Sequence, residues 1–508
     1  MARFVLGLDQ GTTGTTALLL DGAGAVVSRG YREIAQHYPR PAWVEHDPDD
    51  IWASCEEAMR AALDGAGARF TDVAAIGITN QRETVVAWDA RTSAPLHRAI
   101  VWQCRRTAEH CDRLKASGAE EPVRAKTGLK LDAYFSGTKI AWLCANAPAV
   151  AQAVDCGRAA FGTIDSWVLW KLTGGKVHAT DPSNASRTML YDVHARRWDD
   201  ELRATLSVPA SVKLPEVKPS GGVFGTTDPA VTGGAAIPVA AILGDQQAAL
   251  YGQGCWEPGS AKVTFGTGAF LLMNLGTMPR TPPKGLLLTI AADAEGRPVY
   301  ALEGSVFIAG AAIQWLRDGL GIITTAAETQ ALAESIDDTG GVYFVPAFVG
   351  LGAPYWDQGA RGAILGLTRG SSRAHIARAA LEAIAYQSRD VLDAMKAGAG
   401  LSLSTLRVDG GAAANDFLCG FLAGICNVPV DRPASVETTG LGAAYLAGAV
   451  VGFYDATGRG GGQVPALKGL RRTDRVFAPA MSEASRDALY GGWRAAVERV
   501  ATARPASR

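Results

Sequence analysis

A short turn near the N-terminus has the residue types of a phosphate-binding loop. The apolar run Phe4–Leu8 fits a buried strand and ends at the carboxylate of Asp9. The next residues, Gly11–Gly14, combine glycines with hydroxyl side chains, so that consecutive backbone N–H groups can converge on an anion while Thr12 and Thr13 add donors. Asp9 can hold a divalent cation through water. Taken alone, this stretch fits an ordinary glycine–threonine hairpin equally well, and it lacks the Gly-Lys-Ser/Thr signature of a strand-to-helix phosphate loop.

A second turn of the same kind follows in the second half of the chain. The predicted strand Ala261–Phe265 runs into Gly266–Gly268, with the hydroxyl of Thr267 at its centre. Two strand–turn–strand phosphate loops, far apart in the sequence, indicate a duplicated architecture with one loop in each half. We therefore expect two domains, residues 1–252 and 253–508.

Two further predicted strands end in charged residues. Val73–Thr79 leads to the adjacent Arg82 and Glu83, and 237–243 leads to Asp245 with Gln246 beside it. Ligands of open α/β sheets bind where strands end at their carboxyl edges, so these side chains and the two turns are expected to meet at one site. For Arg82 and Glu83 the plain alternative is a solvated ion pair on the surface.

These features supply the parts that phosphoryl transfer needs. Asp9 is the candidate ligand of Mg²⁺ through water, and the turn threonines are candidate donors to the β- and γ-phosphates of ATP. Asp245 is the candidate general base that accepts the proton of an attacking hydroxyl, and Arg82 with Glu83 suits a small polyol. No Ser-His-Asp or Cys-His arrangement stands out, which disfavours hydrolytic and covalent mechanisms.

Composition sets limits on partners and compartment. The chain has 508 residues, 48% hydrophobic and 19% charged, with a formal net charge of −1, so nothing in its charge favours nucleic acid or an acidic membrane. The first residues reach Asp9 too early for a signal peptide, and Gly440–Phe453 is too short to span a bilayer. None of the eight cysteines forms a C-x-x-C pair, which predicts reduced thiols and a cytoplasmic protein without membrane insertion.

Several elements are predicted around these residues. A helix is expected to start at Pro48, capped by Asp47. A long helix is expected after Ser371 or Ser372, ending at Gly398, and Gly304–Gly310 is expected to open another helix. Leu406–Asn415 reads as strand, double glycine and helix, which suits a nucleotide's base or ribose. The polar loop Thr180–Thr188 receives no role.

Longer motifs resemble the glycerol kinases of the FGGY carbohydrate kinase family. The resemblance runs from about Phe4 to Phe453, and the polyol-side stretches Asn80–Thr84 and Trp102–Arg106 distinguish it from the wider family. The matching motifs are Asp9-Gln10-Gly11-Thr12-Thr13, Trp43-Val44-Glu45-His46-Asp47-Pro48, Ile78–Thr84, Val101–Arg106, Gly244-Asp245-Gln246-Gln247, Phe265-Gly266-Thr267-Gly268 and Gly440-Leu441-Gly442-Ala443-Ala444.

The resemblance implies an α/β fold with two ribonuclease-H-like domains, of the actin, hexokinase and Hsp70 type, flanking a central cleft. It implies phosphorylation of glycerol to sn-glycerol 3-phosphate with ATP and Mg²⁺, in a homo-oligomer, dimer or tetramer. The implied glycerol site comprises Arg82, Glu83, Trp102, Tyr134, Asp245, Gln246 and Phe270. The implied nucleotide site comprises Thr12, Thr13, Gly14, Gly266, Thr267, Gly310, Gln314, Gly411 and Asn415.

Three departures from the family pattern stand out. The family usually continues its first loop with Ser, then Ser or Thr, then Arg, where this chain has Gly14, Thr15 and Thr16. The missing guanidinium predicts altered ATP or metal binding. The loop 232–236, where some bacterial relatives bind fructose 1,6-bisphosphate with Lys and Arg, has no basic residue, so that allosteric site is expected to be missing. No histidine lies near that loop to receive a regulatory phosphoryl group.

Other functions are consistent with part of this pattern. A kinase for another polyol or ketose predicts different residues at the glycerol positions. An actin- or Hsp70-like module, or a catalytically dead scaffold, has no need of the Asp245 base. Trp102 and Phe270 also fit core aromatic residues, and Gln314 and Asn415 also fit helix-surface residues.

Overall fold

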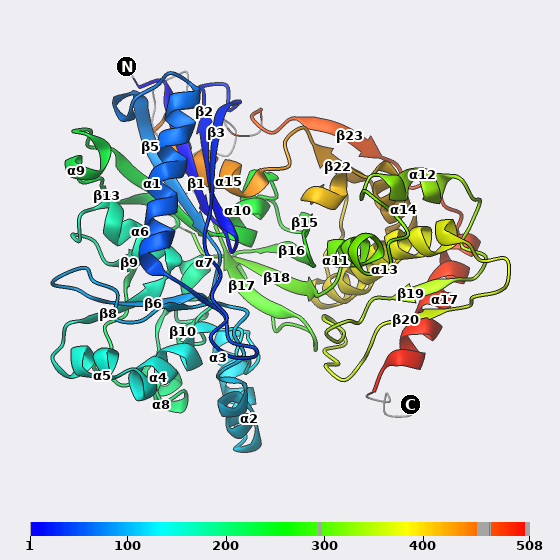
Figure 1. The fold of residues 1–508 in the computed structure, drawn as a ribbon, viewed down its shortest axis with the longest axis horizontal. Helices are drawn as coiled ribbons and strands as arrows, with labels where there is room; N and C mark the ends of the chain where they lie inside the picture. The colour runs from blue at the N-terminus through cyan, green and yellow to red at the C-terminus, as the bar shows by residue number, and fades with distance from the viewer. Residues whose placement is uncertain (1, 293–296, 455–466, 468, 503–508) are drawn as a thin grey trace.

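The computed structural model describes residues 2–292, 297–454, 467 and 469–502, which form two bodies, each built on one mixed β-sheet (Figure 1). The first sheet has the order β13-β14-β5-β1-β2-β3. Its strands are β13 (Gly221–Thr226), β14 (Pro238–Gly244), β5 (Val73–Asn80), β1 (Phe4–Gln10), β2 (Gly14–Leu20) and β3 (Val26–Glu33). The second sheet has the order β17-β18-β16-β15-β21-β22-β23. Its strands are β17 (Leu287–Ala291), β18 (Val299–Val306), β16 (Ala269–Gly276), β15 (Ala261–Phe265), β21 (Leu406–Asp409), β22 (Val430–Pro433) and β23 (Thr473–Phe477).

The two sheets repeat one topology. In the first, β1 pairs antiparallel with β2 and parallel with β5. In the second, β15 pairs antiparallel with β16 and parallel with β21. The strand that precedes each predicted phosphate turn therefore holds the same central place, and the predicted α/β architecture of two related domains is confirmed.

A smaller sheet extends the first body, with the order β4-β7-β6-β8. Its strands are β4 (Glu45–His46), β7 (Ala99–Ile100), β6 (Val85–Asp89) and β8 (Ala159–Thr163). In Figure 1 it lies below the main sheet, next to α4 (Ser136–Asn146) and α5 (Pro148–Asp155). The first body also contains the helices α1 (Pro48–Gly65), α2 (Ala108–Ala116), α3 (Glu120–Thr127), α6 (Ile164–Leu172) and α10 (Asp245–Gly252). Helix α1 begins as predicted, since Asp47 is its N-cap and Pro48 its first residue.

Two helix boundaries differ from the sequence-based expectation. Gly304 does not open a helix, because it lies inside β18, between β16 and β17, and the helix α11 (Gly310–Gln314) starts later. Helix α13 (Arg373–Ala399), capped by Ser372, runs past Gly398 and ends at Gly400, whose φ of 57° is left-handed. Gly398 serves packing instead, since a Cβ there would lie 2.0 Å from Cγ of Pro283.

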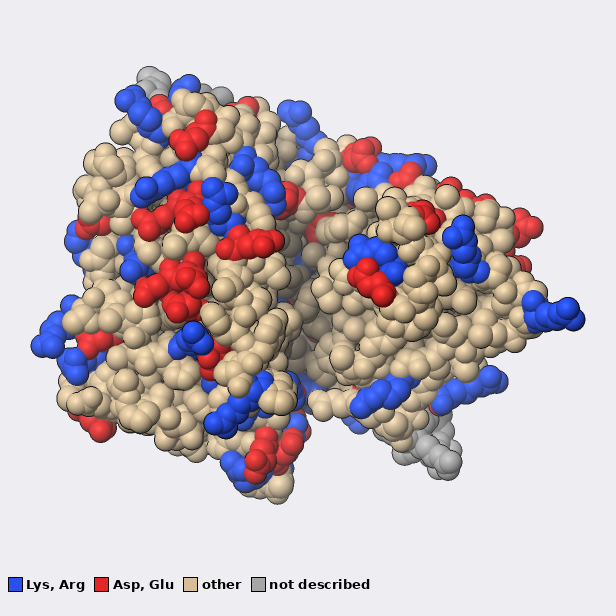
Figure 2. Space-filling view, in the orientation of Figure 1, with Lys and Arg blue, Asp and Glu red and all other residues tan. Residues whose placement is uncertain are grey.

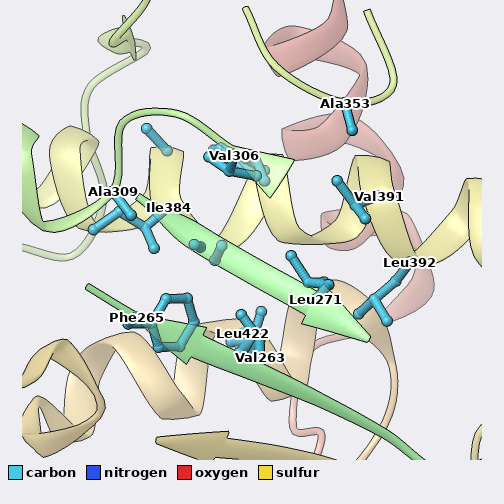
Figure 3. Packing of buried hydrophobic residues seen from close by; sticks show 14 of the residues in the cluster. Val263, Phe265, Leu271, Val306, Ala309, Ala353, Ile384, Val391, Leu392 and Leu422 are labelled. Atoms are coloured by element: carbon cyan, nitrogen blue, oxygen red, sulfur yellow. The ribbon is translucent and has the colours of Figure 1, made fainter. Parts of the chain in front are cut away.

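The core of the second body lies between its sheet and α13, α14 (Asp416–Cys426) and α17 (Glu483–Val500). Figure 3 shows Val263 and Phe265 of β15, Leu271 of β16 and Val306 of β18 beside Val391 and Leu392 of α13, all of them buried. The strand that carries the second turn is therefore held from one side by a close-packed apolar layer.

Helix α15 (Thr438–Val450) joins the two bodies. It lies between β22 and β23 of the second sheet in the chain, yet it packs on the first sheet, and its orange ribbon lies beside β1 and α10 in Figure 1. Glycines allow this approach. A Cβ at Gly7 would lie 2.3 Å from the carbonyl oxygen of Gly440, and a Cβ at Gly442 would lie 1.9 Å from that of Ala248. The surface shows a groove between the bodies (Figure 2).

The described cysteines are all free thiols, in agreement with the expectation of reduced cysteines. Within the same part of the chain, no helix combines the length and apolar character that crossing a membrane requires.

The contact between α10 and α15 can be tested with two helical glycines. We expect Gly442→Ala to destabilise the protein by at least about 1 kcal/mol, because the new methyl group must push α15 away from α10. Gly420→Ala in α14 is the matched control. Its Cβ would meet no atom within 4 Å, so it should be neutral or stabilise by up to about 1 kcal/mol through helix propensity. The check is the free energy of unfolding in denaturant, and equal effects at both positions would contradict this role for Gly442.

Candidate functional site

The two glycine turns have the same closure. In the first turn the backbone N–H of Gly11 donates to the carbonyl oxygen of Gly14 (N···O 2.9 Å), and in the second the N–H of Gly266 donates to that of Gly268 (2.8 Å). Thr267 is exposed at the centre of the second turn. Both turns follow the central strand of their sheet, so they lie at equivalent edges of the two bodies.

A tryptophan links the first turn to the predicted polyol residues. Nε1 of Trp102 donates to Oγ1 of Thr12 (2.9 Å), and the backbone N–H of Trp102 donates to Oγ1 of Thr84 (3.1 Å). Because Oγ1 of Thr12 accepts from the indole, its own proton remains to be donated to an anion. Thr13 is exposed beside it.

Glycines from two other elements surround the second turn. A Cβ at Gly310, the first residue of α11, would lie 2.5 Å from the carbonyl oxygen of Gly266, and the N–H of Gly310 donates to that oxygen (3.0 Å). Gly410, with a φ of 83°, lies equally close to Phe265, whereas a Cβ at Gly411 would meet nothing within 4 Å. The double glycine therefore leaves open space above the end of β21.

The last two predicted nucleotide residues lie further along the second body. Gln314 is exposed at the end of α11. Asn415 caps α14, where its side chain accepts from the N–H of Leu418 (2.9 Å) and donates to Oγ1 of Thr329 (3.2 Å). Its local structural role is thus an N-cap.

Arg82 is the centre of the polyol-side cluster. Its buried guanidinium contacts the carboxylate of Asp245 through Nε (3.0 Å) and that of Glu303 through Nη1 and Nη2 (2.6 and 3.2 Å). Nη1 also donates to Oε1 of Gln247 (3.1 Å). Asp245 and Gln247 belong to α10 of the first body, and Glu303 belongs to β18 of the second. The side chain of Arg82 therefore connects the two bodies.

A second buried arginine completes the network. Arg187 donates through Nε to Glu83 (2.7 Å) and through Nη2 to Glu303 (2.8 Å). Burial alone would raise the pKa of Glu303, but Arg187 and Arg82 outweigh it and lower that pKa to about 2. Burial raises the pKa of Glu83, which Arg187 and Arg82 only partly offset. The carboxylate of Glu303 is therefore ionised at neutral pH.

The backbone at Glu83 adopts a sparsely populated conformation. Its φ of 62° is left-handed, which for a residue with a long side chain costs of order 1–3 kcal/mol and is typical of functional sites. The carbonyl oxygen of Glu83 is held by Oγ of Ser136 (3.1 Å). With this backbone conformation, the consecutive side chains of Arg82 and Glu83 both point into the same buried cluster.

Aromatic rings form one wall of the cluster. Trp102 and Tyr134 are half-buried and meet edge to face, with ring centroids 5.6 Å apart. Arg187 lies over the ring of Tyr134 at 5.6 Å. Phe270 lies on β16 in the second body, in register with Ser305, while Leu272 is in register with Glu303. Phe270 is therefore on the same face of its sheet as Glu303.

Asp245 and Gln246 open helix α10, where a carboxylate is favoured by the N-terminal end of the helix. The side chain of Asp245 is 32% exposed, the one accessible carboxylate of its network with Arg82, Glu83 and Glu303. Oε1 of Gln246 accepts from Nζ of Lys262 (2.5 Å). The structure thus brings together Arg82, Glu83, Trp102, Tyr134, Asp245 and Gln246 at one edge of the first body.

Sequence reasoning missed three buried charges, Arg187, Glu303 and Lys262. Arg187 lies in the polar loop to which no role was given, and it is 0% exposed. Glu303 and Lys262 are each the only charged residue of a buried strand. A charged residue in the middle of a buried strand was the available signal, because such a residue needs a partner.

Asp9 has the electrostatic character of a cation ligand. Burial, then the carboxylates of Asp245 and Glu437, raise the pKa of Asp9 to about 8. No cluster of three or more potential metal-ligating side chains occurs in the described residues. Mg²⁺ usually keeps several waters and binds through one or two carboxylates and substrate phosphates, so Asp9, beside the predicted phosphate turn, fits that ion.

The departure at Gly14 of the first turn has a local explanation. A Cβ at Gly14 would lie 2.5 Å from the carbonyl oxygen of Arg32 and 2.7 Å from the hydroxyl oxygen of Tyr31. Thr16 lies in register with Asp9 on one side and with Tyr31 on the other. The neighbouring strand β3 therefore leaves room only for a glycine at position 14.

Comparison with known proteins gives matches along the whole chain. Residues 4–252 match the N-terminal domain of the FGGY family of carbohydrate kinases, and residues 261–450 match its C-terminal domain. The glycerol kinase of Carboxydothermus hydrogenoformans is 55% identical over 497 residues, covering 98% of each chain. The glycerol kinase of Petrotoga mobilis is 54% identical over 499 residues, again covering 98% of each.

Solved structures give the same picture. The Plasmodium falciparum glycerol kinase with ADP superimposes with a TM-score of 0.91 at 36% identity, covering 98% of each chain. A xylulose kinase from Rhodospirillum rubrum reaches a TM-score of 0.82 at 26% identity, covering 98% of this chain and 99% of its own.

The pKa of Asp9 predicts how stability depends on pH. Between pH 4 and 8 the folded protein keeps a proton that the unfolded chain, with an ordinary pKa of 3.8, has lost, so wild-type stability falls as pH rises through this range. Asp9→Asn removes this dependence. We expect its melting temperature in EDTA to exceed that of the wild type by a margin that grows from pH 5 to pH 8. Asp112→Asn, at a side chain 73% exposed, is the control. A difference that stays constant with pH would contradict the assignment.

Proposed function

Because this chain belongs to the FGGY family of carbohydrate kinases, we propose that the residues gathered around Arg82 and the two glycine turns form a single site for phosphoryl transfer from ATP to glycerol. The chain is an enzyme with the activity of the glycerol kinases, to which it is 55% identical over nearly its full length. The observation that carries the site assignment is the 2.9 Å hydrogen bond between Trp102 and Thr12, which joins the polyol-side wall to a phosphate turn. The halves 1–252 and 253–508 supply one turn each.

Glycerol is held by the buried polar cluster. In this assignment Arg82, Glu83, Tyr134 and Gln246 hydrogen-bond its hydroxyl groups, while Trp102 and Phe270 pack on its carbon chain. Nη2 of Arg82 has two N–H groups and donates one of them to Glu303, so one remains for a substrate oxygen. The ion pairs with Glu303 fix the guanidinium before substrate arrives, which lowers the entropy cost of binding.

Asp245 acts as general base. Its accessible carboxylate accepts the proton as the hydroxyl oxygen of glycerol attacks the γ-phosphorus, the new P–O bond forms, and the bond to the leaving ADP breaks. The neighbouring Arg82 keeps one oxygen of Asp245 occupied at 3.0 Å, which orients the other. The product is sn-glycerol 3-phosphate.

The nucleotide lies along the two turns. Thr12, Thr13 and Thr267 donate to the phosphates, while Gly14 and Gly266 leave room for the phosphates beside the backbone of the turns. Gly310, Gln314, Gly411 and Asn415 line the adenosine end, where the open space above Gly411 accepts a flat group. Mg²⁺, held by Asp9 through water, would neutralise charge on the phosphates. We further propose a cytoplasmic homo-oligomer, dimer or tetramer.

The assay is ATP consumption with glycerol, xylulose, gluconate and ribulose in parallel. We expect a clear preference for glycerol, and we expect Asp245→Asn to lower kcat by about 10²–10⁴-fold, the usual contribution of general-base catalysis. Asp337→Asn, at an exposed position of the second body, is the matched control and should keep wild-type turnover. Loss of the glycerol preference would refute the substrate, and full turnover in Asp245→Asn would refute the base.

Regulation by fructose 1,6-bisphosphate is expected to be missing. The helix α9 (Pro229–Thr232) and the glycines that follow it carry no lysine or arginine to bind two phosphates. Addition of the sugar bisphosphate at up to millimolar concentration should leave the initial rate unchanged, and dose-dependent inhibition below that concentration would show that another surface binds it.

A further inference from the structure

Lys262 is a buried cation that the proposed mechanism does not use. It lies in the middle of β15, is 0% exposed, and shares a sheet face with Leu272 and Glu303 through the strand register. Nζ of Lys262 donates to Oε1 of Gln246 (2.5 Å) and to Oγ1 of Thr264 (2.7 Å). Both acceptors are uncharged.

A contribution to folding stability does not explain why a lysine occupies position 262. None of the ion pairs found among the described residues includes Lys262, so its charge is buried without a carboxylate within 4.0 Å. Burial lowers the pKa of Lys262 to about 8, and the more distant carboxylates of Asp409 and Asp245 only partly oppose this. An apolar side chain of similar volume at such a position is often neutral or stabilising.

The bond to Gln246 fixes the orientation of a carboxamide. A protonated lysine has only donors, so the atom of Gln246 that faces it must be the oxygen. The amino group, Nε2, is therefore turned away from Lys262 and keeps both of its N–H donors for another partner. Without Lys262, the carboxamide can rotate and present its oxygen instead.

We propose that Lys262 is a positioning residue for glycerol binding, which acts by holding Gln246 so that its Nε2 donates to a substrate hydroxyl oxygen. The inference rests on the proposed function, because it takes Gln246 as part of the polyol site. It also explains the location of Lys262. The lysine connects α10, which carries Asp245 and Gln246, to the strand that ends in the Gly266 turn, so the polyol side and the second phosphate turn share one contact.

The charge environment gives this role a pH dependence. Asp409 of β21, Asp245 of α10 and Glu303 of β18 favour the protonated amine, and Arg82 at the end of β5 disfavours it. Lys262 is charged below pH 8 and loses its proton above it. The hydrogen bond to Gln246 is strongest in the charged form. The wild-type KM for glycerol should therefore rise as pH increases from 7.5 to 9.

The decisive experiment is a double-mutant cycle with Lys262→Met and Gln246→Leu, measured as KM for glycerol and for ATP. We expect Lys262→Met to raise the glycerol KM about tenfold, the usual effect of losing a hydrogen bond to a charged group, and to change the ATP KM less than twofold. In the Gln246→Leu background the same substitution should have less than a twofold effect, because no carboxamide remains to be held. The rise of KM above pH 8 should be missing in Lys262→Met.

Two further measurements separate positioning from a structural role. Lys262→Met should melt at or above the wild-type temperature at pH 7, and its advantage should shrink as pH rises from 8 to 10.5, where the wild-type lysine no longer needs to be buried charged. Thr264→Val, which removes the other acceptor and leaves Gln246 in place, is the matched control and should change the glycerol KM less than threefold.

Each result bears on one claim. An unchanged glycerol KM in Lys262→Met, an equal effect in the Gln246→Leu background, or loss of the folded state in Lys262→Met would overturn the role of Lys262. A wild-type enzyme that fails to phosphorylate glycerol would overturn the proposed function instead, and that result is read from the wild type before any variant is compared.

Discussion

The carboxylate of Glu303 is the contact on which the site depends. It accepts from Arg82 and from Arg187, two buried guanidinium groups of the first body, while Glu303 itself belongs to a strand of the second sheet. Removing one member of such a network leaves an uncompensated buried charge, which typically costs about 3–5 kcal/mol. Arg82 in turn holds Asp245, so the position of the proposed base is set by a residue from the opposite body. The site and the association of the two bodies are therefore one structure.

Helix α15 makes the same connection by packing alone. Its glycines let it approach β1 and α10 at backbone contact, so the strand that ends in Asp9 and the helix that begins with Asp245 are both fixed against one rigid element. A movement of α15 would carry the first glycine turn and the proposed base together. The close backbone contacts of Gly440 with Gly7 and of Gly442 with Ala248 thus explain the glycines of the Gly440–Ala444 motif, without any contact between these glycines and a ligand.

The sequence was informative where the signal is local. The strands that lead to Asp9, Arg82 and Asp245 could be predicted because each is a run of consecutive apolar residues followed by polar or glycine residues. Arg187 and Glu303 could not, because their pairing joins residues 116 positions apart, and only the tertiary fold brings the loop of Arg187 to the strand of Glu303. The predicted end of helix α13 at Gly398 was wrong for a related reason. Gly398 is required by its close packing against Pro283, and the helix ends two residues later, at Gly400, whose backbone is left-handed. The assignment of single residues to glycerol or nucleotide remains a prediction.

The charges of the site are balanced only in part by the protein. Burial and the carboxylates of Asp245 and Glu437 raise the pKa of Asp9 to about 8, whereas burial of Lys262 among neutral acceptors lowers its pKa to about 8. Both are costs to folding, since each charged form is disfavoured in the folded protein. A cation beside Asp9 would reduce the cost of ionising Asp9. A substrate hydroxyl bound to Gln246 would benefit from the orientation that the buried Lys262 gives to the carboxamide. The same two groups that stability alone would remove are those that a cation and a polyol would complement, which is how a site trades stability for binding.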